Sequence, residues 1–263
     1  MNFNNIEFEI RQGVATLTLN RPKSLNSFTT DMHAEIRTVM QQVSEDSQIR
    51  CLVITGAGRG FCAGQDLGDR AQSTEDGSPD VGASVVKNYN PLIRSIMHLP
   101  KPVICAVNGV AAGAGASIAL ACDIVLAARS ASFIQAFCKI GLIPDSGGSW
   151  NLPRSVGLAR AKGLALLGDR LNAETAEHWG LIWKCVDDEA LQAEAQKMAN
   201  HFATQPTRAL GRIKKLLHDS SSNTLEEQLV LEAQAMGELG QSDDYREGVA
   251  AFLEKRPADF KGI

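Results

Sequence analysis

The sequence predicts an α/β fold, with a core of alternating strands and helices followed by a helical section. Short apolar runs suited to buried strands recur before about Arg170, and glycine-rich turns and helical patterns follow them. Beyond Arg170, helical patterns follow one another, with a clean break at Pro206. The length of 263 residues suits one large domain or a core with a smaller appendage.

Each predicted strand is a short apolar or alternating run. The strands are expected at residues 6–10, 14–19, 51–55, 124–127 and 133–134, and at the start of 103–123. The first two flank Gln12-Gly13, which predicts a β-hairpin. The helices are expected where apolar residues recur at helical spacing, at residues 32–43, 85–99, 173–179, 189–203, 207–217, 225–239 and 243–255. Two polar or glycine-rich stretches, 56–67 and 70–82, are expected as loops, the second of them mobile.

Composition and charge exclude several classes of function. The net charge of −4 and the pI near 5.8 argue against nucleic acid or anionic membranes as partners. The acidic N-terminus lacks the apolar segment of a secretory signal, and Asn108 breaks the only long apolar stretch, so no membrane span is expected. The six cysteines contain no C-x-x-C pair, which favours free thiols in a reducing cytoplasm. The five histidines lack metal-ligand spacing, so no metal site is expected.

One stretch offers a place for chemistry. Residues 103–123 pass from an apolar strand, through a turn containing Gly113 and Gly115, into small and apolar residues suited to a buried helix. Backbone N–H groups in the first turn of a helix lack intrahelical partners, and the helix dipole favours negative charge there. Either this turn binds an oxyanion, or the two glycines only let the helix pack closely on a sheet.

Three glycine-rich motifs in a fixed order carry a family resemblance. They are GFCAGQDL at residues 60–67, NGVAAGAG at residues 108–115 and GLIPDSGG at residues 141–148. Together with Asn20-Arg21-Pro22 and residues 252–255, they resemble the enoyl-CoA hydratase/isomerase (crotonase) family over nearly the whole chain.

The resemblance implies a fold and partners. Residues 1–200 are expected to form a spiral of strand–strand–helix turns that holds the CoA and acyl sites, and residues 201–263 a helical oligomerisation region. Acyl-CoA thioesters are the expected substrates, so CoA is part of the substrate and no separate cofactor is expected. Homotrimers or dimers of trimers are the expected assembly, and enzymes of the same pathway are further candidate partners.

By motif position, the resemblance assigns two oxyanion-hole donors, the backbone N–H groups of Gln65 and Ala114. Proton removal next to a thioester places negative charge on its oxygen, and preorganised amides lower that barrier by about 3–4 kcal/mol each. Because backbone groups do this, the side chains at the two positions are expected to matter little.

Departures from the hydratase pattern indicate a different reaction. Hydratases of the family carry two glutamates where this chain has Ser117 and Phe137, which cannot activate water as a carboxylate does, so hydration is not expected. Asp145 stands where several isomerases and a dehalogenase of the family keep an acid. It either caps the following helix or, surrounded by Phe133, Phe137, Ile143 and Trp150, has a raised pKa suited to proton transfer.

Segments 61–67, 89–91, 143–148 and 242–248 resemble more narrowly the family members that isomerise a ring epoxide. This resemblance implies an acyl-CoA isomerase that converts ring-1,2-epoxyphenylacetyl-CoA to oxepin-CoA in aerobic phenylacetate catabolism, with Asp145 relaying a proton or polarising the epoxide. Two alternatives stay open: a general Δ3,Δ2-enoyl-CoA isomerase, and a non-catalytic scaffold for an acyl-CoA pathway complex.

The resemblance also assigns the residues that bind substrate. The pocket for the acyl group is expected to be lined by Phe137, Leu142 and Val110. The CoA moiety is expected to contact backbone groups of Ala63, Gly64 and Asp66, the side chain of Lys23 at a phosphate, and Phe252 and Lys255 from a neighbouring subunit.

Overall fold

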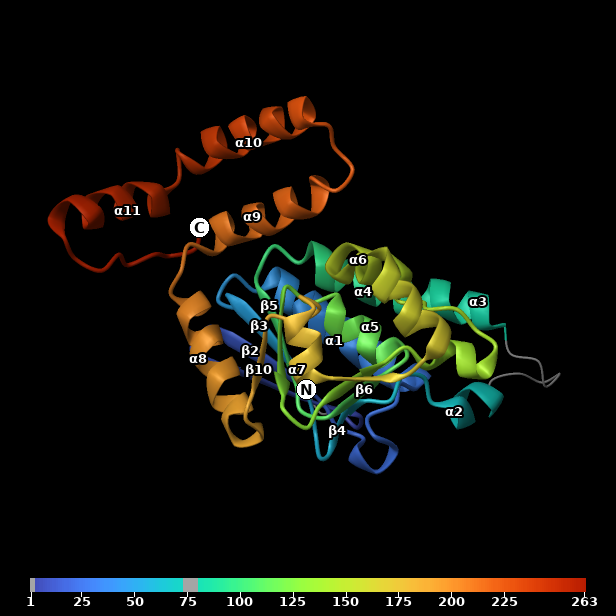
Figure 1. Cartoon of the computed structure of the whole chain (residues 1–263). Helices are drawn as coiled ribbons and strands as arrows, with labels where there is room; N and C mark the ends of the chain where they lie inside the picture. Colours follow the sequence, from blue (N-terminus) through green and yellow to red (C-terminus); the bar gives the residue numbers. More distant parts are fainter. Residues whose placement is uncertain (1–2, 73–79) are drawn as a thin grey trace.

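Two β-sheets lie at the centre of the chain, which the computed structural model describes over residues 3–72 and 80–263 (Figure 1). The larger sheet has the strand order β1-β2-β3-β5-β7-β10, and the smaller has the order β4-β6-β8-β9. The strands of the larger sheet are β1 (Ile6–Arg11), β2 (Val14–Leu19), β3 (Cys51–Gly56), β5 (Val103–Val107), β7 (Ile124–Ala128) and β10 (Lys184–Val186). Those of the smaller sheet are β4 (Gly60–Cys62), β6 (Val110–Ala112), β8 (Ser132–Ile134) and β9 (Arg170–Asn172). The α/β prediction is confirmed.

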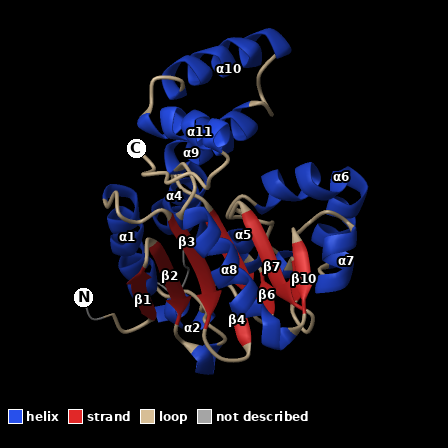
Figure 2. Cartoon of the chain, turned by 90° about the vertical axis from the view of Figure 1, so that its left-hand side faces the viewer, coloured by secondary structure: helices blue, strands red, loops and turns tan. Residues whose placement is uncertain are grey.

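Helices surround the sheets and connect their strands (Figure 2). In the core they are α1 (Thr30–Glu45), α2 (Leu67–Gln72), α3 (Val81–Ser84), α4 (Asn90–His98), α5 (Ala114–Leu120), α6 (Gly148–Leu167), α7 (Ala173–His178) and α8 (Leu191–Ala203). Shorter turns are the 3₁₀ segments η1 (Pro22–Ser24), η3 (Ala136–Ile140) and η4 (Asp188–Ala190) and the π-turn η2 (Val85–Tyr89).

The hairpin and the first helix form as their patterns predict. β1 and β2 pair antiparallel through Gln12 and Gly13, whose φ angles of +49° and +80° match the two-residue turns that suit twisted hairpins. α1 begins after Thr29, whose hydroxyl accepts a hydrogen bond from the Met32 N–H at 3.2 Å. Its apolar stripe, from Met32 to Val43, is buried against the sheet.

The chain winds between the two sheets. β3, β5 and β7 are neighbours in the larger sheet, and each is followed in sequence by a short strand of the smaller sheet, β4, β6 or β8. All of these neighbours pair in parallel, and helices lead from one turn to the next. This is the strand–strand–helix spiral that the family resemblance implies.

The sequence patterns miss four strands, each three residues long. β4 and β6 lie in stretches predicted as loop and turn, and β9 and β10 lie where only helices are predicted. Three residues are too few to show an alternating pattern, and each strand is held by partners distant in sequence. The loop expected at 70–82 is also partly wrong, because α2 and α3 occupy its two ends; residues 73–79 lie outside the described residues.

Three C-terminal helices project from the core as an arm, here defined as residues 204–263 (Figures 1 and 2). They are α9 (Thr207–Asp219), α10 (Leu225–Leu239) and α11 (Asp243–Glu254). The arm is tied to the core by Lys214, whose Nζ lies 2.8 Å from both the Asp123 carboxylate and the Ile96 carbonyl oxygen. Residues 201–203 complete α8, which packs on the larger sheet, so the boundary expected at 200/201 falls inside a core helix.

The arm carries large apolar side chains that the single chain leaves exposed. They are Leu225, Leu229, Val230, Met236, Val249, Phe252 and Leu253. So many exposed large apolar side chains on three helices are typical of a protein–protein contact. Within the residues that the structure describes, no helix combines the length and the hydropathy needed to cross a bilayer. All six cysteines are free thiols, as the lack of paired spacing predicts.

Candidate active site

The parallel ladder of the smaller sheet brings two glycine-rich turns together. Cys62 of β4 pairs with Ala111 of β6, so the residues that follow each strand lie beside one another. A Cβ atom on Gly64 would lie 2.9 Å from the Ala112 carbonyl oxygen and 3.3 Å from the Ala114 nitrogen, and the φ of Gly64 is +91°. Only glycine allows this approach of one backbone to another.

The pairing with Phe28 leaves the Gln65 N–H on the side of α5. The Phe28 N–H donates to the Gly64 carbonyl at 2.7 Å, and the Asp66 N–H donates to the Phe28 carbonyl at 2.9 Å. In a parallel bridge of this kind, the residue between the two bonded groups points its own N–H the other way. Neither the Gln65 nor the Ala114 N–H has a hydrogen-bond partner within residues 3–72 and 80–263. Two adjacent N–H groups are therefore available for one anionic oxygen.

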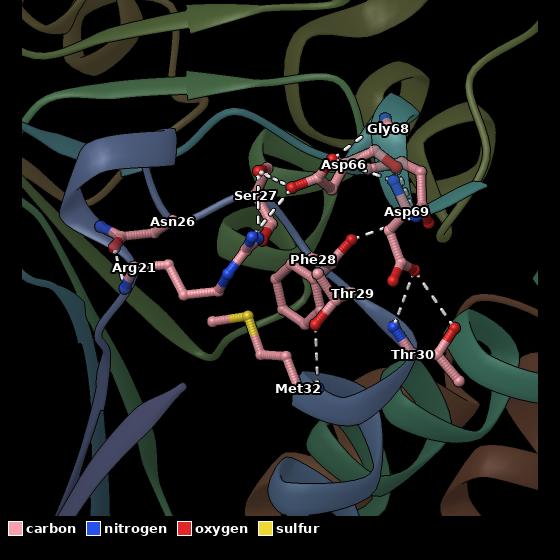
Figure 3. Close-up of polar contacts among 11 residues, drawn as sticks. Arg21, Asn26, Ser27, Phe28, Thr29, Thr30, Met32, Asp66, Gly68 and Asp69 are labelled. Atoms are coloured by element: carbon pink, nitrogen blue, oxygen red, sulfur yellow. Dashed lines mark hydrogen bonds and ion pairs between the residues drawn. The ribbon is translucent and has the colours of Figure 1, made fainter. Parts of the chain in front are cut away.

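A polar network anchors the turn that carries Gln65 (Figure 3). The Asp66 carboxylate lies 3.0 Å from Arg21 Nη2, accepts a bond from the Ser27 hydroxyl at 3.2 Å, and accepts the N–H groups of Gly68 and Asp69 at the start of α2. Partial burial acts to raise the pKa of Asp66, but the Asp69 N–H and the Arg21 guanidinium outweigh it and hold the pKa below its ordinary value. The ionised carboxylate thus ties the turn to the segment that follows β2.

Asn26 is a second anchor, and it is not among the site residues predicted from the sequence. Its side chain is fully buried and donates to the carbonyl oxygens of Gly60 at 2.9 Å and Phe61 at 3.1 Å, while its Oδ1 accepts the Arg21 N–H at 2.8 Å. Its φ of +56° is one that asparagine tolerates better than most residues. Asn26 therefore holds β4 at its entry to the site.

The Gln65 side chain also has a structural role, against the expectation that its identity matters little. Its Nε2 donates to the carbonyl oxygens of Phe28 at 3.0 Å and Asp66 at 3.1 Å. Its Oε1 accepts a hydrogen bond from the Tyr89 hydroxyl at 2.8 Å. No local pattern reveals this contact, because the two residues are 24 positions apart.

Asp145 lies on the turn between η3 and α6. The next two residues, Ser146 and Gly147, have φ angles of +52° and +76°, and the Ser146 hydroxyl donates to Asp145 Oδ1 at 2.9 Å. Gly147 is the N-cap of α6, so Asp145 stands two residues before the cap, and its backbone carbonyl accepts the Gly148 N–H at 2.8 Å.

The apolar residues expected around Asp145 differ in exposure. Ile143 is 78% exposed, and the Trp150 ring lies 4.1 Å from the Arg154 guanidinium at the surface of the single chain. Phe137 is buried, and its ring lies 3.8 Å from where a Cβ on Gly113 would stand. The structure thus brings Phe137 to the turn that carries Ala114.

The remaining residues expected to contact substrate are divided between two places. Val110 and Leu142 are half-buried, on β6 and after η3 respectively, and the Leu142 N–H donates to the Phe137 carbonyl at 2.9 Å. The expected CoA contacts Ala63, Gly64 and Asp66 share the turn of Gln65, and Lys23 is exposed on η1. Phe252 is 83% exposed, and with Lys255 it lies at the end of α11, at the opposite end of the molecule from β4 (Figure 2). One chain does not bring these two groups together.

Comparison with known proteins assigns the family. A profile of the enoyl-CoA hydratase/isomerase family matches residues 9–263. The chain belongs to this family. The resemblance drawn from the three glycine-rich motifs is thereby confirmed.

Relatives in this family cover almost all of the chain. A protein of Escherichia coli (strain K12) named 1,2-epoxyphenylacetyl-CoA isomerase is 59% identical over 253 residues, which cover 96% of this chain and 97% of that protein. A probable enoyl-CoA hydratase of Rhodobacter capsulatus is 47% identical over 262 residues, the full length of both. The crystal structure of an enoyl-CoA hydratase from Bacillus anthracis has a TM-score of 0.93 at 33% identity, covering 99% of this chain and 100% of that chain.

The position where hydratases of the family carry a glutamate is tightly enclosed here. Ser117 is fully buried in α5, and a Cβ on Gly148 would lie 2.7 Å from its hydroxyl and 3.5 Å from Gln135 Oε1. The Ser117 hydroxyl and Gln135 Oε1 have no hydrogen-bond partner among the described residues. This space beneath the start of α6 fits a small hydroxyl and leaves little room for the longer glutamate.

Metal chemistry has no ligand set in the part of the chain that the structure describes. There, no three histidine, cysteine, aspartate or glutamate side chains come together in a way that would hold a metal ion. Burial also raises the pKa of the Cys62 thiol, next to the Gln65 turn, to about 12, so this thiol stays protonated.

Proposed function

We propose that this chain is an acyl-CoA isomerase that converts ring-1,2-epoxyphenylacetyl-CoA to oxepin-CoA in phenylacetate catabolism. The observation that carries the proposal is the pair of N–H groups of Gln65 and Ala114, which have no partner among the described residues, in a chain that offers Asp145 and lacks both hydratase glutamates. The 59% identity to a protein named 1,2-epoxyphenylacetyl-CoA isomerase supports the choice of substrate.

In this proposal the two N–H groups hold the thioester oxygen. Negative charge develops on that oxygen when a proton leaves the neighbouring carbon, and two preorganised donors stabilise the charge by about 3–4 kcal/mol each. The donors need no rearrangement during the reaction, because the Phe28 pairing and the ladder of the smaller sheet fix both turns.

Asp145 moves the proton. Its carboxylate takes a proton from the acyl group and returns it to another atom of the same group, so the reaction is an isomerisation with no net gain or loss of protons. The Ser146 hydroxyl, which donates to Oδ1, orients the carboxylate for this exchange. Phe137, Val110 and Leu142 contact the ring.

The CoA moiety extends from the Gln65 turn to the surface. The carbonyl oxygens of Ala63 and Gln65 have no partner among the described residues and face the nucleotide, while Lys23 binds a phosphate. Phe252 and Lys255 reach this site from a neighbouring subunit, since their own chain holds them at the opposite end. The exposed apolar side chains of the arm support a homotrimer, or a dimer of trimers. The free thiols fit a reducing compartment, which supports a cytoplasmic location.

One experiment tests the reaction and separates it from the alternatives. Wild type and Asp145→Asn are each mixed with a 3-enoyl-CoA and, separately, with the ring epoxide, and the conjugated product is followed by ultraviolet absorbance. We expect wild type to convert the epoxide and the variant to lose activity by at least about 100-fold with an unchanged melting temperature. Wild type that converts only the 3-enoyl-CoA is a general Δ3,Δ2-enoyl-CoA isomerase. If wild type converts neither substrate, the isomerase proposal is refuted, and the non-catalytic scaffold is the remaining alternative.

A further inference from the structure

Tyr89 is a buried polar residue that the proposed reaction does not use. It ends the π-turn η2 and is fully buried, in line with Leu92, Ile93 and Ile96 on the inner face of α4. A π-turn inserts an extra residue into a helix and is found frequently at functional sites. Here the inserted turn directs a phenol hydroxyl into the core.

The hydroxyl reaches the residue that carries one of the two N–H donors. Tyr89 donates to Gln65 Oε1 at 2.8 Å, and Gln65 Nε2 donates in turn to the carbonyl oxygens of Phe28 and Asp66 at 3.0 and 3.1 Å. The same Phe28 carbonyl accepts the Asp66 N–H at 2.9 Å. The amide nitrogen of the Gln65 side chain therefore links the Phe28 and Asp66 carbonyl oxygens, which flank the Gln65 backbone. The Tyr89 hydroxyl holds the amide oxygen of the same side chain in place.

We propose that Tyr89 is a positioning residue that aims the Gln65 N–H at the thioester oxygen. This inference rests on the proposed function. Hydrogen bonds weaken steeply as the donor turns away from the acceptor, and an oxyanion hole is effective only when its donors are fixed beforehand. Without the phenol, the half-buried Gln65 Oε1 has lost its donor, and the amide turns to find another at the expense of its bonds to Phe28 and Asp66.

The packing of the ring makes the hydroxyl separable from the fold. The Tyr89 ring meets the His33 ring edge-on with centroids 4.5 Å apart, and the Phe28 ring lies 6.1 Å away. Phenylalanine at position 89 keeps these contacts and removes only the hydroxyl. Tyr89→Phe therefore removes the hydroxyl that bonds Gln65 and retains the aromatic ring.

A double-mutant cycle with Gln65→Met tests whether the two residues act as one unit. We expect Tyr89→Phe to lower kcat about tenfold while KM stays within about twofold, because the misaimed donor acts chiefly on the transition state. Gln65→Met lowers kcat similarly, and the double variant is no slower than Gln65→Met alone. Losses that multiply in the double variant overturn the inference, since Tyr89 would then act independently of Gln65.

A binding readout distinguishes positioning from a purely structural role. Hydrogen bonds to the thioester oxygen shift the absorbance of a bound conjugated thioester, trans-cinnamoyl-CoA, to longer wavelength. We expect a smaller shift with Tyr89→Phe than with wild type or with the control Tyr245→Phe, which changes an exposed tyrosine of the arm. A lowered melting temperature with an unchanged shift and kcat shows a structural role and overturns the inference.

The same measurements separate this inference from the function on which it rests. A wild type that converts the epoxide, with Tyr89→Phe equal to it in kcat and in absorbance shift, overturns the role of Tyr89 alone. A wild type that gives neither turnover nor any shift overturns the oxyanion hole, and the role of Tyr89 with it.

Discussion

Replacing Gly64 with alanine tests whether the gap between the two glycine-rich turns controls catalysis. The new Cβ would stand 2.9 Å from the Ala112 carbonyl oxygen, so the turns must separate by about 0.5 Å to reach an ordinary contact of 3.4 Å. The φ of +91° adds a backbone cost of about 1–3 kcal/mol for alanine. Because the Ala114 nitrogen is only 3.3 Å from the same Cβ, the separation moves one donor relative to the other. We expect kcat to fall about 10- to 100-fold.

Gly58, in the connection between β3 and β4, offers a matched control. Its φ is +73°, and a Cβ there would also stand 2.9 Å from its nearest neighbour, but that neighbour is the Pro22 side chain. Gly58→Ala therefore carries similar strain without pushing the turns of Gly64 and Ala114 apart. Initial rates with the ring epoxide and melting temperatures are measured for both variants. The reasoning fails if Gly64→Ala keeps kcat within about threefold of Gly58→Ala at an equal loss of melting temperature.

Two further predictions concern stability and assembly. Desolvation, with a contribution from Arg37, lowers the pKa of buried His33 to about 4, so the unfolded chain takes up a proton first, near pH 6.5. The free energy of unfolding then falls as the pH drops from 6.5 towards 4, by up to about 3 kcal/mol. His33→Leu is expected to flatten this part of the curve of melting temperature against pH. A wild-type curve that is already flat over this range contradicts the prediction. On the arm, Leu229→Glu combined with Val230→Glu places two negative charges among the exposed apolar side chains of α10. We expect light scattering to give a smaller molecular mass for this double variant than for wild type. An unchanged mass argues against an interface at α10.

Elements with long, regular patterns can be predicted from the sequence. α1 has an apolar residue at each turn, and the β1–β2 hairpin has two residues with positive φ between alternating strands. The short strands β4 and β6 have no such local signal, yet they carry the two turns of the site. Their pairing depends on the spiral as a whole, in which β3, β5 and β7 of the larger sheet are each followed in sequence by a strand of the smaller sheet.

Motif resemblance located the residues of the candidate site, but it did not reveal the residues that hold them in place. The motifs point to Gln65, Ala114 and Asp145 because glycine spacing around them is characteristic. Asn26 and Tyr89 act through contacts that cross from one turn of the spiral to another, and a side chain that bonds to distant carbonyl oxygens leaves no periodic trace. The exposure of Ile143, two residues before Asp145, likewise cannot be predicted from the sequence, because it depends on which way the turn faces.

The parallel pairing of β4 with β6 sets the distance between the two N–H donors of the proposed reaction. Neighbouring strands lie about 4.8 Å apart, so two N–H nitrogens that follow adjacent strands can both lie about 2.9 Å from one oxygen when the angle between them at that oxygen is about 110°. That angle is close to the directions of the two lone pairs on a carbonyl oxygen. Because the distance is set by hydrogen bonds between main chains, it does not depend on the residues expected to line the acyl pocket, and selectivity for the acyl group can be adjusted there, at residues such as Phe137.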